Sequence, residues 1–312
     1  MFFSTKKDII NNDIIDSSYT NIDNRIFKIG GFNKLEKCLS NIIFEYIPGK
    51  DNAFREISKL PIYLKLAGSF IYKDRMYVVC GFDNTGKSTK KVFSINLSDL
   101  LAGVWKEEAD FPTNTYSPRF VTIDNKVYAI GNGYTLNDKG DNTIYTATIV
   151  NDKLVWSSFT KLGGYYKDSS IFTRNKLLYI GSGTINNGVN QYILGNSNDS
   201  RTIFSRVAIF NLNSFSYKLI YFKKEVIKLL GVGYIRNAAN SPSKNSLVSN
   251  NKLYMLDRLG LLQELSSWKK LKGNYFTATD AEIIIVENKL YLFEPKVFDE
   301  PLQHTIVLEY EE

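Results

Sequence analysis

Six short runs of apolar residues recur along the 312-residue chain, and each begins with a basic residue and ends in a turn. The runs span residues 25–31, 75–81, 126–132, 176–182, 252–257 and 289–294. The first four begin 50, 51 and 50 residues apart, and the last two intervals are 76 and 37 residues. β-Branched and aromatic residues dominate the runs, which indicates strands. Self-similarity at a period near 50 residues predicts a β-propeller in which each repeat forms one blade.

Each repeat is predicted to form four antiparallel strands. In the second repeat we expect strands at 68–74, 75–81, 91–97 and 104–112, and in the third at 117–123, 126–131, 143–150 and 154–162. Further outer strands are expected at 54–61, 216–221 and 267–272. An aromatic residue recurs near the start of these outer strands, at Phe54, Trp105, Trp156, Tyr217 and Trp268. We expect these rings to fill the space between neighbouring blades.

The sixth repeat lacks an outer strand, because only 280–287, 289–293 and 305–310 fit the pattern before the chain stops. Residues 1–7 have the aromatic, polar and basic order of the other outer strands. We therefore expect the N-terminal segment to pair with the last blade, which would remove the exposed edges of an open array. The alternative is a frayed tail, as is common at termini. The prediction is one all-β domain over 1–312, a six-bladed propeller with long loops at 183–205 and 223–246.

These repeats resemble the kelch-type, galactose-oxidase-like propellers over nearly the whole chain. A double glycine that ends the second strand is present at Gly30-Gly31, and it becomes Cys80-Gly81, Gly131-Asn132 and Gly181-Ser182 in the next repeats. The resemblance implies blades of four antiparallel strands. The copper-radical oxidases of this superfamily use histidine ligands, which a chain with His304 alone does not supply. We therefore expect neither that activity nor any other cofactor.

The composition says more about the source and location of the protein than about its chemistry. The net charge is +7, from 39 basic and 32 acidic residues, and the richness in Lys, Asn, Ile and Tyr is typical of an AT-rich genome. The basic residues are scattered, so we expect no specific nucleic-acid binding. The N-terminus has no apolar signal segment and the chain has no apolar run long enough to span a membrane, which predicts a cytoplasmic or virion location. The two cysteines make no disulfide framework, and Cys80 is expected in the core.

Three local patterns could carry chemistry. Residues 81–88 match the phosphate-binding pattern G-x-x-x-x-G-K-[ST]. A phosphate-binding loop needs a helix after it, whereas 89–97 is a predicted strand, so we expect a hairpin loop without nucleotide. Residues 137–142 offer oxygen ligands for calcium, but turn chemistry explains the same Asn, Asp and Gly residues. His304 is expected to be a solvated turn residue.

Loop length is unequal between the two ends of the predicted blades. Turns between first and second strands are tight, at residues 74–75, 124–125, 174–175, 250–251 and 287–288. Connections from second to third strands are long, at 32–40, 82–90, 133–142, 183–205 and 295–304, and so are the fourth-to-first connections at 62–67 and 223–246. Both kinds of long connection leave from the same end of a blade. We therefore expect a binding surface there, the alternative being neutral insertions.

Two functions follow as hypotheses. The first is a non-enzymatic interaction or assembly module that binds a protein partner or neighbouring subunits, for example a phage tail nozzle-like virion component. Its contact residues are predicted to be Asn187, Asn190, Gln191, Tyr192, Ile193, Leu194 and Tyr134. The alternative is a carbohydrate-binding or sialate-mutarotase-like kelch propeller, with Arg119, Tyr134, Arg236 and Glu282 at the mouth of the channel.

Overall fold

The computed structural model describes residues 2–8, 13–48, 54–123, 125–131 and 143–161, and the strands that follow residue 161. Side chains are described within 13–161 and at Ile171, Leu178, Tyr291 and Phe293. The described residues form strands and one short 3-10 helix, η1 (Leu97–Asp99), and no α-helix. None of them forms a helix with the length and apolar character needed to cross a bilayer.

Six sheets of four or five antiparallel strands are present among these residues, and we number them as blades 1 to 6. Blade 1 contains β2 (Ile14–Ile15), β3 (Ser18–Ile22), β4 (Arg25–Asn33), β5 (Cys38–Tyr46) and β6 (Arg55–Lys59). Blade 2 contains β7 (Gly68–Tyr72), β8 (Arg75–Val79), β9 (Val92–Asn96) and β10 (Lys106–Glu107). Blade 3 contains β11 (Arg119–Ile123), β12 (Lys126–Ile130), β13 (Thr143–Val150) and β14 (Lys153–Lys161).

The second half of the chain repeats this plan. Blade 4 contains β16 (Ser170–Arg174), β17 (Leu177–Gly181), β19 (Arg206–Asn211) and β20 (Ser216–Tyr221), and blade 5 contains β21 (Ser246–Ser249), β22 (Lys252–Leu256), β23 (Leu262–Glu264) and β24 (Lys269–Lys270). Blade 6 contains β25 (Glu282–Val286), β26 (Lys289–Phe293), β29 (Thr305–Glu311) and β1 (Phe2–Asp8). Two small sheets pair β15 (Tyr165–Lys167) with β18 (Thr184–Asn186), and β27 (Lys296–Val297) with β28 (Glu300–Pro301).

The predicted strands and the all-β propeller fold are confirmed, with small shifts of their ends. The largest difference is the outer strand of blade 2, expected over 104–112, where only Lys106–Glu107 pair with β9. The two-residue turn between β7 and β8 is Lys73-Asp74, one position earlier than expected, with φ of 48° and 58°. Positive φ at both turn residues is the hairpin geometry that matches strand twist.

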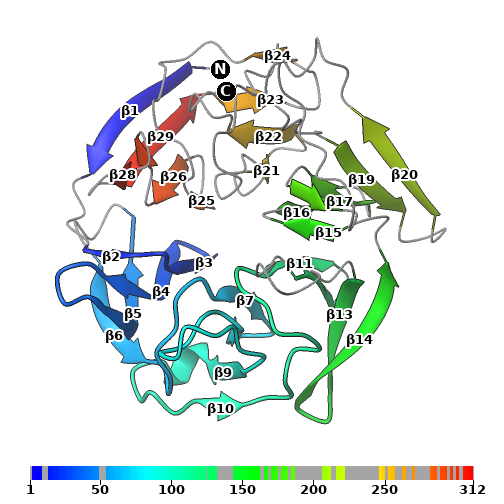
Figure 1. Ribbon diagram of the computed structural model, residues 1–312. Coiled ribbons are helices and arrows are strands. Elements are labelled where there is room, and N and C mark those ends of the chain that lie inside the picture. The colour runs from blue at the N-terminus through cyan, green and yellow to red at the C-terminus, as the bar shows by residue number, and fades with distance from the viewer. Residues whose placement is uncertain are drawn as a thin grey trace.

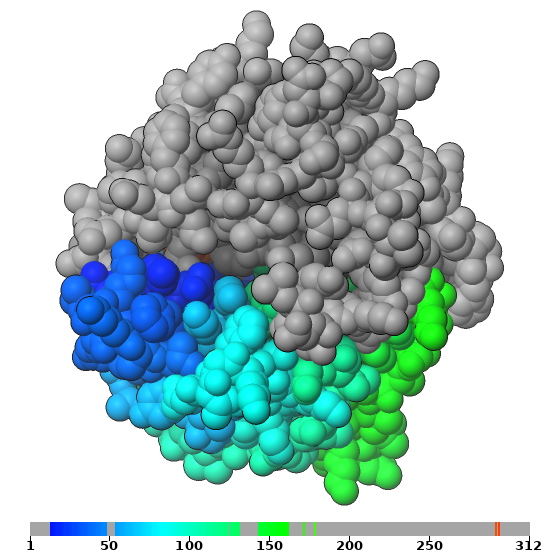
Figure 2. Space-filling view, viewed as in Figure 1, coloured from blue at the N-terminus to red at the C-terminus, as the bar shows by residue number. Residues whose placement is uncertain are grey.

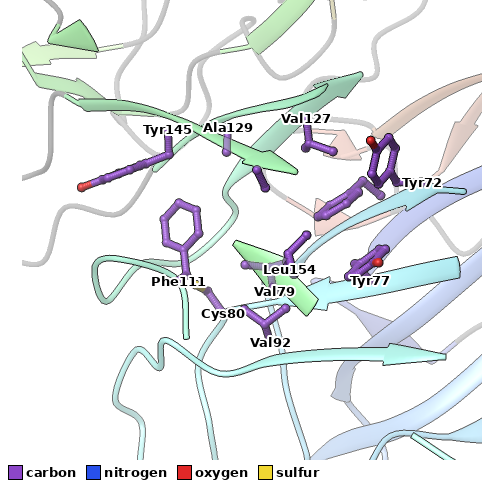
Figure 3. Packing of buried hydrophobic residues seen from close by; sticks show 12 residues of the cluster. Tyr72, Tyr77, Val79, Cys80, Val92, Phe111, Val127, Ala129, Tyr145 and Leu154 are labelled. Carbon is purple, nitrogen blue, oxygen red and sulfur yellow. The ribbon is translucent and has the colours of Figure 1, made fainter. Parts of the chain in front are cut away.

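The second strands of blades 1 to 3 (β4, β8 and β12) are buried on both faces, which explains why they are largely apolar rather than alternating. In β8, Met76 and Val78 belong to a cluster shared with blade 1, whereas Tyr77 and Val79 belong to a cluster shared with blade 3. Figure 3 shows the second of these clusters, where Phe111 and Tyr145 lie close together with ring centroids 5.2 Å apart. Cys80 lies in the same cluster, so its predicted place in the core is confirmed.

Of the aromatic residues predicted to pack between blades, Phe54, Trp105 and Trp156 have described side chains, and all three pack on clusters that join two blades. The side chains of Tyr217 and Trp268 lie outside the described part of the chain. Trp105 of blade 2 packs on the cluster that blades 1 and 2 share, and Trp156 of blade 3 packs on the cluster that blades 2 and 3 share. Phe54 lies with Tyr291 and Phe293 of blade 6. These three aromatic residues therefore pack at the seams between neighbouring blades.

The sheets are arranged around a common centre, and both termini lie beside blade 6 (Figure 1). The innermost strands contact one another in the order β3, β7, β11, β16, β21 and β25, and β25 contacts β3. At the outer side of blade 6, β1 pairs with β29 from Phe2–Glu311 to Asp8–Thr305. This pairing has the register that closure by the N-terminal segment requires. The six-bladed ring closed in this way stays a prediction.

Candidate interaction face

The blades differ sharply between their two ends. The end from which second-to-third and fourth-to-first connections leave is called the loop face here. In the described part of the chain it consists of residues 34–37, 60–67, 80–91 and 112–118. The opposite end carries two-residue turns such as 73–74 and 151–152. Figure 2 shows blades 1 to 3, which carry all of these segments, as a continuous blue-to-green arc.

Several predicted long loops are shorter or more ordered than expected. The connection predicted over 32–40 is a four-residue turn, because β4 runs to Asn33 and β5 begins at Cys38. The predicted 183–205 loop contains β18, where the strand-forming segment Thr184–Asn186 pairs with β15. The predicted 295–304 loop contains the β27–β28 pair. Of the 223–246 loop, Ser246 already belongs to β21, and residues 223–245 lie outside the described part of the chain.

Backbone hydrogen bonds tie the fourth-to-first connections together across the blades. The amide of Leu66 donates to the carbonyl of Asp16 at 2.8 Å, and the amide of Ser117 donates to the carbonyl of Leu66 at 2.6 Å. These three residues precede the inner strands of blades 1, 2 and 3, and all have left-handed backbones, with φ of 57°, 51° and 46°. The loop face therefore rests on backbone hydrogen bonds that link the segments before the inner strands of blades 1 to 3.

The glycine pair within β4 permits the close approach of two neighbouring segments. A Cβ atom on Gly30 would lie 2.4 Å from the carbonyl oxygen of Leu64, and one on Gly31 would lie 2.4 Å from Oγ of Ser17. Gly31 has φ of 115°, which is accessible to glycine but strained for other residues. In blade 2, Cys80 occupies the position equivalent to Gly30, with φ of 59°.

The connection between β8 and β9 contains the sequence that matches a phosphate-binding pattern, and it folds as a hairpin loop. The carboxylate of Asp83 accepts hydrogen bonds from the amide and hydroxyl of Thr85, at 2.8 and 2.6 Å, and from the amide of Lys87 at 3.4 Å. The hydroxyl bond of Thr85 is the main cause that lowers the pKa of Asp83. These donors are thus already occupied, and β9 follows where a helix would be needed. The hairpin interpretation is confirmed, and the absence of nucleotide binding stays a prediction.

A row of half-buried side chains crosses the loop face from blade 1 to blade 3. The ammonium of Lys65 lies 5.4 Å from the centroid of the Phe32 ring. The backbones of Lys65 and Phe82 exchange hydrogen bonds of 3.1 and 2.9 Å. The rings of Phe82 and Tyr116 stack with centroids 4.7 Å apart. Sequence reasoning missed this row, although the aromatic that follows Gly30-Gly31 and Cys80-Gly81, at Phe32 and Phe82, repeats at the blade period.

Exposed apolar side chains occur at both ends of the blades. On the loop face, Leu35 is 73% and Tyr63 is 47% exposed. At the opposite end, Leu101 is 83% exposed, and Val104 and Val150 are also exposed. Exposure alone therefore does not select a binding face. The loop face differs from the opposite end in its loop length and in its row of aromatic residues.

Arg25 and Arg75, which open the first two apolar runs, lie at the end opposite the loop face. The guanidinium of Arg25 donates to Glu45 at 2.5 Å, and that carboxylate also accepts from Arg55 at 3.0 Å. Arg75 donates to the side chains of Asn96 and Ser94, at 2.5 and 2.6 Å. These contacts join the strands within a blade, so Arg25 and Arg75 have a structural role.

A buried carboxylate joins blades 2 and 3 at the same end. Glu108 accepts hydrogen bonds from the hydroxyl of Ser94 at 2.7 Å and from the amide of Leu154 at 3.4 Å. The ammonium of Lys106 lies 3.0 Å from the same side chain and also donates to the carbonyl of Asp152 at 2.5 Å. The opposite end of these blades is thus held by polar contacts between strands.

Most of the predicted contact residues cannot be placed. Asn187, Asn190, Gln191, Tyr192, Ile193, Leu194, Tyr134, Arg236, His304 and residues 137–142 lie outside the described part of the chain. Arg119 and Glu282 are the first residues of β11 and β25, so both lie at the loop-face end of the inner strands. Their strands are three positions apart in the cycle of inner strands and are not neighbours.

Comparison with known proteins supports the fold. No protein-family profile matches the chain. The chain is 23% identical to Kelch-like protein 40 of Xenopus laevis over 124 residues, which are 40% of this chain and 19% of that protein. It is 27% identical to Kelch-like protein 40 of Xenopus tropicalis over 135 residues, which are 43% of this chain and 20% of that protein. The alignments thus cover about a fifth of these relatives.

A solved structure, that of YjhT, resembles nearly the whole chain. The match has a TM-score of 0.56 at 14% sequence identity, and it covers 89% of this chain and 84% of that structure. At this identity the likeness concerns the fold. Together with the blade topology, these similarities identify the chain as a divergent kelch-type β-propeller.

Proposed function

We propose that this propeller is a non-enzymatic interaction or assembly module that binds a protein partner through its loop face. The observation that carries the proposal is the difference between the two ends of the described blades. The half-buried aromatic residues and the connections 60–67, 80–91 and 112–118 lie at one end, while the other end carries two-residue turns and one longer connection, 97–105. Aromatic residues are enriched in protein interfaces. The kelch-type fold is also consistent with a protein-interaction module, although a fold by itself does not define a function.

The finer proposal is a structural component of a phage or other virus, such as a tail nozzle-like protein, acting in the virion or the cytoplasm of the host. The AT-rich residue composition supports this source. In such an assembly, neighbouring copies of the chain would be partners in addition to a second protein. Mass spectrometry of purified virions tests this directly, since the chain should be found there in stoichiometric amounts.

Affinity capture from the native source tests the binding proposal. The wild type is compared with a variant in which residues 187–199 are replaced by a short turn, and with a control carrying Leu101→Ser and Val104→Ser at the opposite end. Changes in loop length cost little folding free energy, so the excision variant should unfold at the wild-type denaturant concentration. We expect partner capture to be lost in the excision variant and kept in the control. The reverse pattern would contradict the proposal.

A second candidate is a carbohydrate-binding or mutarotase-like propeller. It is supported by Arg119 and Glu282, whose strands begin at the loop-face end of the central axis. Mutarotation of sialic acid, followed by NMR, tests it. Catalysis that is lost in Arg119→Ala or Glu282→Ala would favour this candidate over the interaction module.

A further inference from the structure

We propose that the row formed by Phe32, Lys65, Phe82 and Tyr116, called the aromatic–lysine row below, binds an acidic segment of the protein partner. This inference rests on the proposed function and specifies the chemistry of the partner. The row is continuous. The ammonium of Lys65 lies over the Phe32 ring, and the backbone of Lys65 forms hydrogen bonds with that of Phe82. The Phe82 ring in turn stacks on the Tyr116 ring. Each of the four side chains is half-buried, so each is held in place and still reaches solvent.

The backbone under the row is fixed before a partner arrives. The amide of Gly81 donates to the carbonyl of Thr115 at 3.1 Å, and the amide of Thr89 donates to the carbonyl of Gly81 at 2.9 Å. The connection that carries Lys65 is bound on its other side by the Gly31 amide, which donates to Leu64 at 2.8 Å. A surface organised in advance loses little conformational entropy on binding.

The outward charge of the row is positive at its centre. Lys65 forms no ion pair with any residue whose side chain is described. Further lysines lie on the adjoining turns, at positions 34, 37, 87 and 90. Of the carboxylates on these turns, Asp83 is directed into its own loop, and Glu36 accepts a hydrogen bond from Cys38 at 3.6 Å. Asp13 and Asp16 lie beside β2. An ammonium placed over the Phe32 ring suits a carboxylate that is flanked by apolar or aromatic side chains.

A protein segment fits this surface better than a nucleic acid does. Nucleic-acid binding rests on neutralising many phosphates, and on bases stacking against free aromatic faces. Here Phe82 and Tyr116 cover one face of each other. An acidic peptide needs only the central ammonium and the apolar edges of the rings.

Fluorescence anisotropy with a labelled random Glu–Tyr copolymer tests the proposal on the full-length protein. The variants are Lys65→Ala, Lys65→Arg and Phe82→Ala. Lys73→Ala is the matched control, because Lys73 lies 5.5 Å from the Tyr72 ring in the same kind of contact, but in a turn at the opposite end. Oligo(dT) of similar charge is titrated in parallel. Urea unfolding of each variant shows whether it retains the fold.

We expect saturable binding of the copolymer that weakens as salt is raised. Lys65→Ala and Phe82→Ala should weaken it by about tenfold, whereas Lys65→Arg and Lys73→Ala should bind like the wild type. The proposal would be overturned if the wild type did not bind the copolymer, or if it bound oligo(dT) more tightly. It would also be overturned if Lys65→Ala and Phe82→Ala bound the copolymer like the wild type, or if Lys73→Ala lost as much affinity as they do. Capture of a partner from the native source uses none of these probes. A negative result with the acidic copolymer would therefore refute the acidic partner without refuting the proposed interaction function.

Discussion

The ring of Tyr19 in β3 stacks on the ring of Phe293 in β26, with centroids 4.7 Å apart and planes 9° from parallel. These residues are far apart in the chain and belong to blades 1 and 6. Phe54 and Tyr46 of blade 1 pack on the same cluster. The ring centroids of Phe54 and Phe293 are 5.6 Å apart, and those of Tyr46 and Tyr291 are 6.0 Å apart. The seam between the first and last blades is thus an aromatic core.

Removal of the Phe293 ring should open this seam. Phe293 is 1% exposed, and replacing a buried Phe by Ala costs about 3–5 kcal/mol. We expect Phe293→Ala to lower the free energy of unfolding by that amount, measured by urea denaturation. Val150→Ala, at an exposed position, is the control and should change it by less than about 0.5 kcal/mol. Equal effects of the two substitutions would mean that the seam contributes little.

Two glycines with positive φ should respond differently to the same substitution. In Gly31→Ala the new Cβ would lie 2.4–2.6 Å from Ser17, Ile14 and Ile15, and φ is 115°. In Gly86→Ala the site is open and φ is 73°. We expect Gly86→Ala to cost about 1 kcal/mol of folding free energy and Gly31→Ala more than about 2 kcal/mol. Thermal or urea unfolding of the pair measures this, and similar costs would refute the close approach.

The strands and the propeller fold were predictable because a strand that is buried on both faces is apolar along its whole length. Met76 and Val78 face one neighbouring blade and Tyr77 and Val79 face the other, so the whole run is apolar, and the run recurs with each blade. Turn chemistry located the hairpins to within one residue, as at Lys73-Asp74.

The aromatic–lysine row was not predictable in the same way. It forms between residues that are distant in sequence, and it depends on the backbone pairing of Lys65 with Phe82 and on the stacking of Phe82 on Tyr116. Loop length was overestimated where a strand continues past its apolar run, as β4 does to Asn33. Neither the stacking nor the strand extension leaves a local pattern in the sequence.

Tyr77 should make stability depend on alkaline pH. Burial raises the pKa of Tyr77 to about 12, against the partial opposition of Arg75. A pKa that is higher in the folded state contributes stability that is complete below the unfolded value near 10 and is lost as pH rises toward 12. We expect the urea midpoint of the wild type to fall more steeply between these pH values than that of Tyr77→Phe. Parallel curves for the two proteins would contradict the burial of this hydroxyl.

The N-terminal strand should stabilise the last blade. β1 pairs with β29 along its whole length, from Phe2 to Asp8. Its removal would expose an edge strand and apolar surface. We expect deletion of residues 1–8 to lower the free energy of unfolding by on the order of several kcal/mol and to promote self-association, measured by urea denaturation and light scattering. Wild-type behaviour of the truncated protein would show that the ring is not closed by this strand.

Hydrogen–deuterium exchange of the protein, free and bound to the partner captured from its native source, tests the binding surface most directly. Contact with the loop face should slow the exchange of amides in residues 60–67 and 80–91, and in the 187–199 segment. Amides in the turns at 73–74 and 151–152, at the opposite end, should exchange as in the free protein. Protection confined to those turns, with 60–67 and 80–91 unchanged, would contradict binding through the loop face.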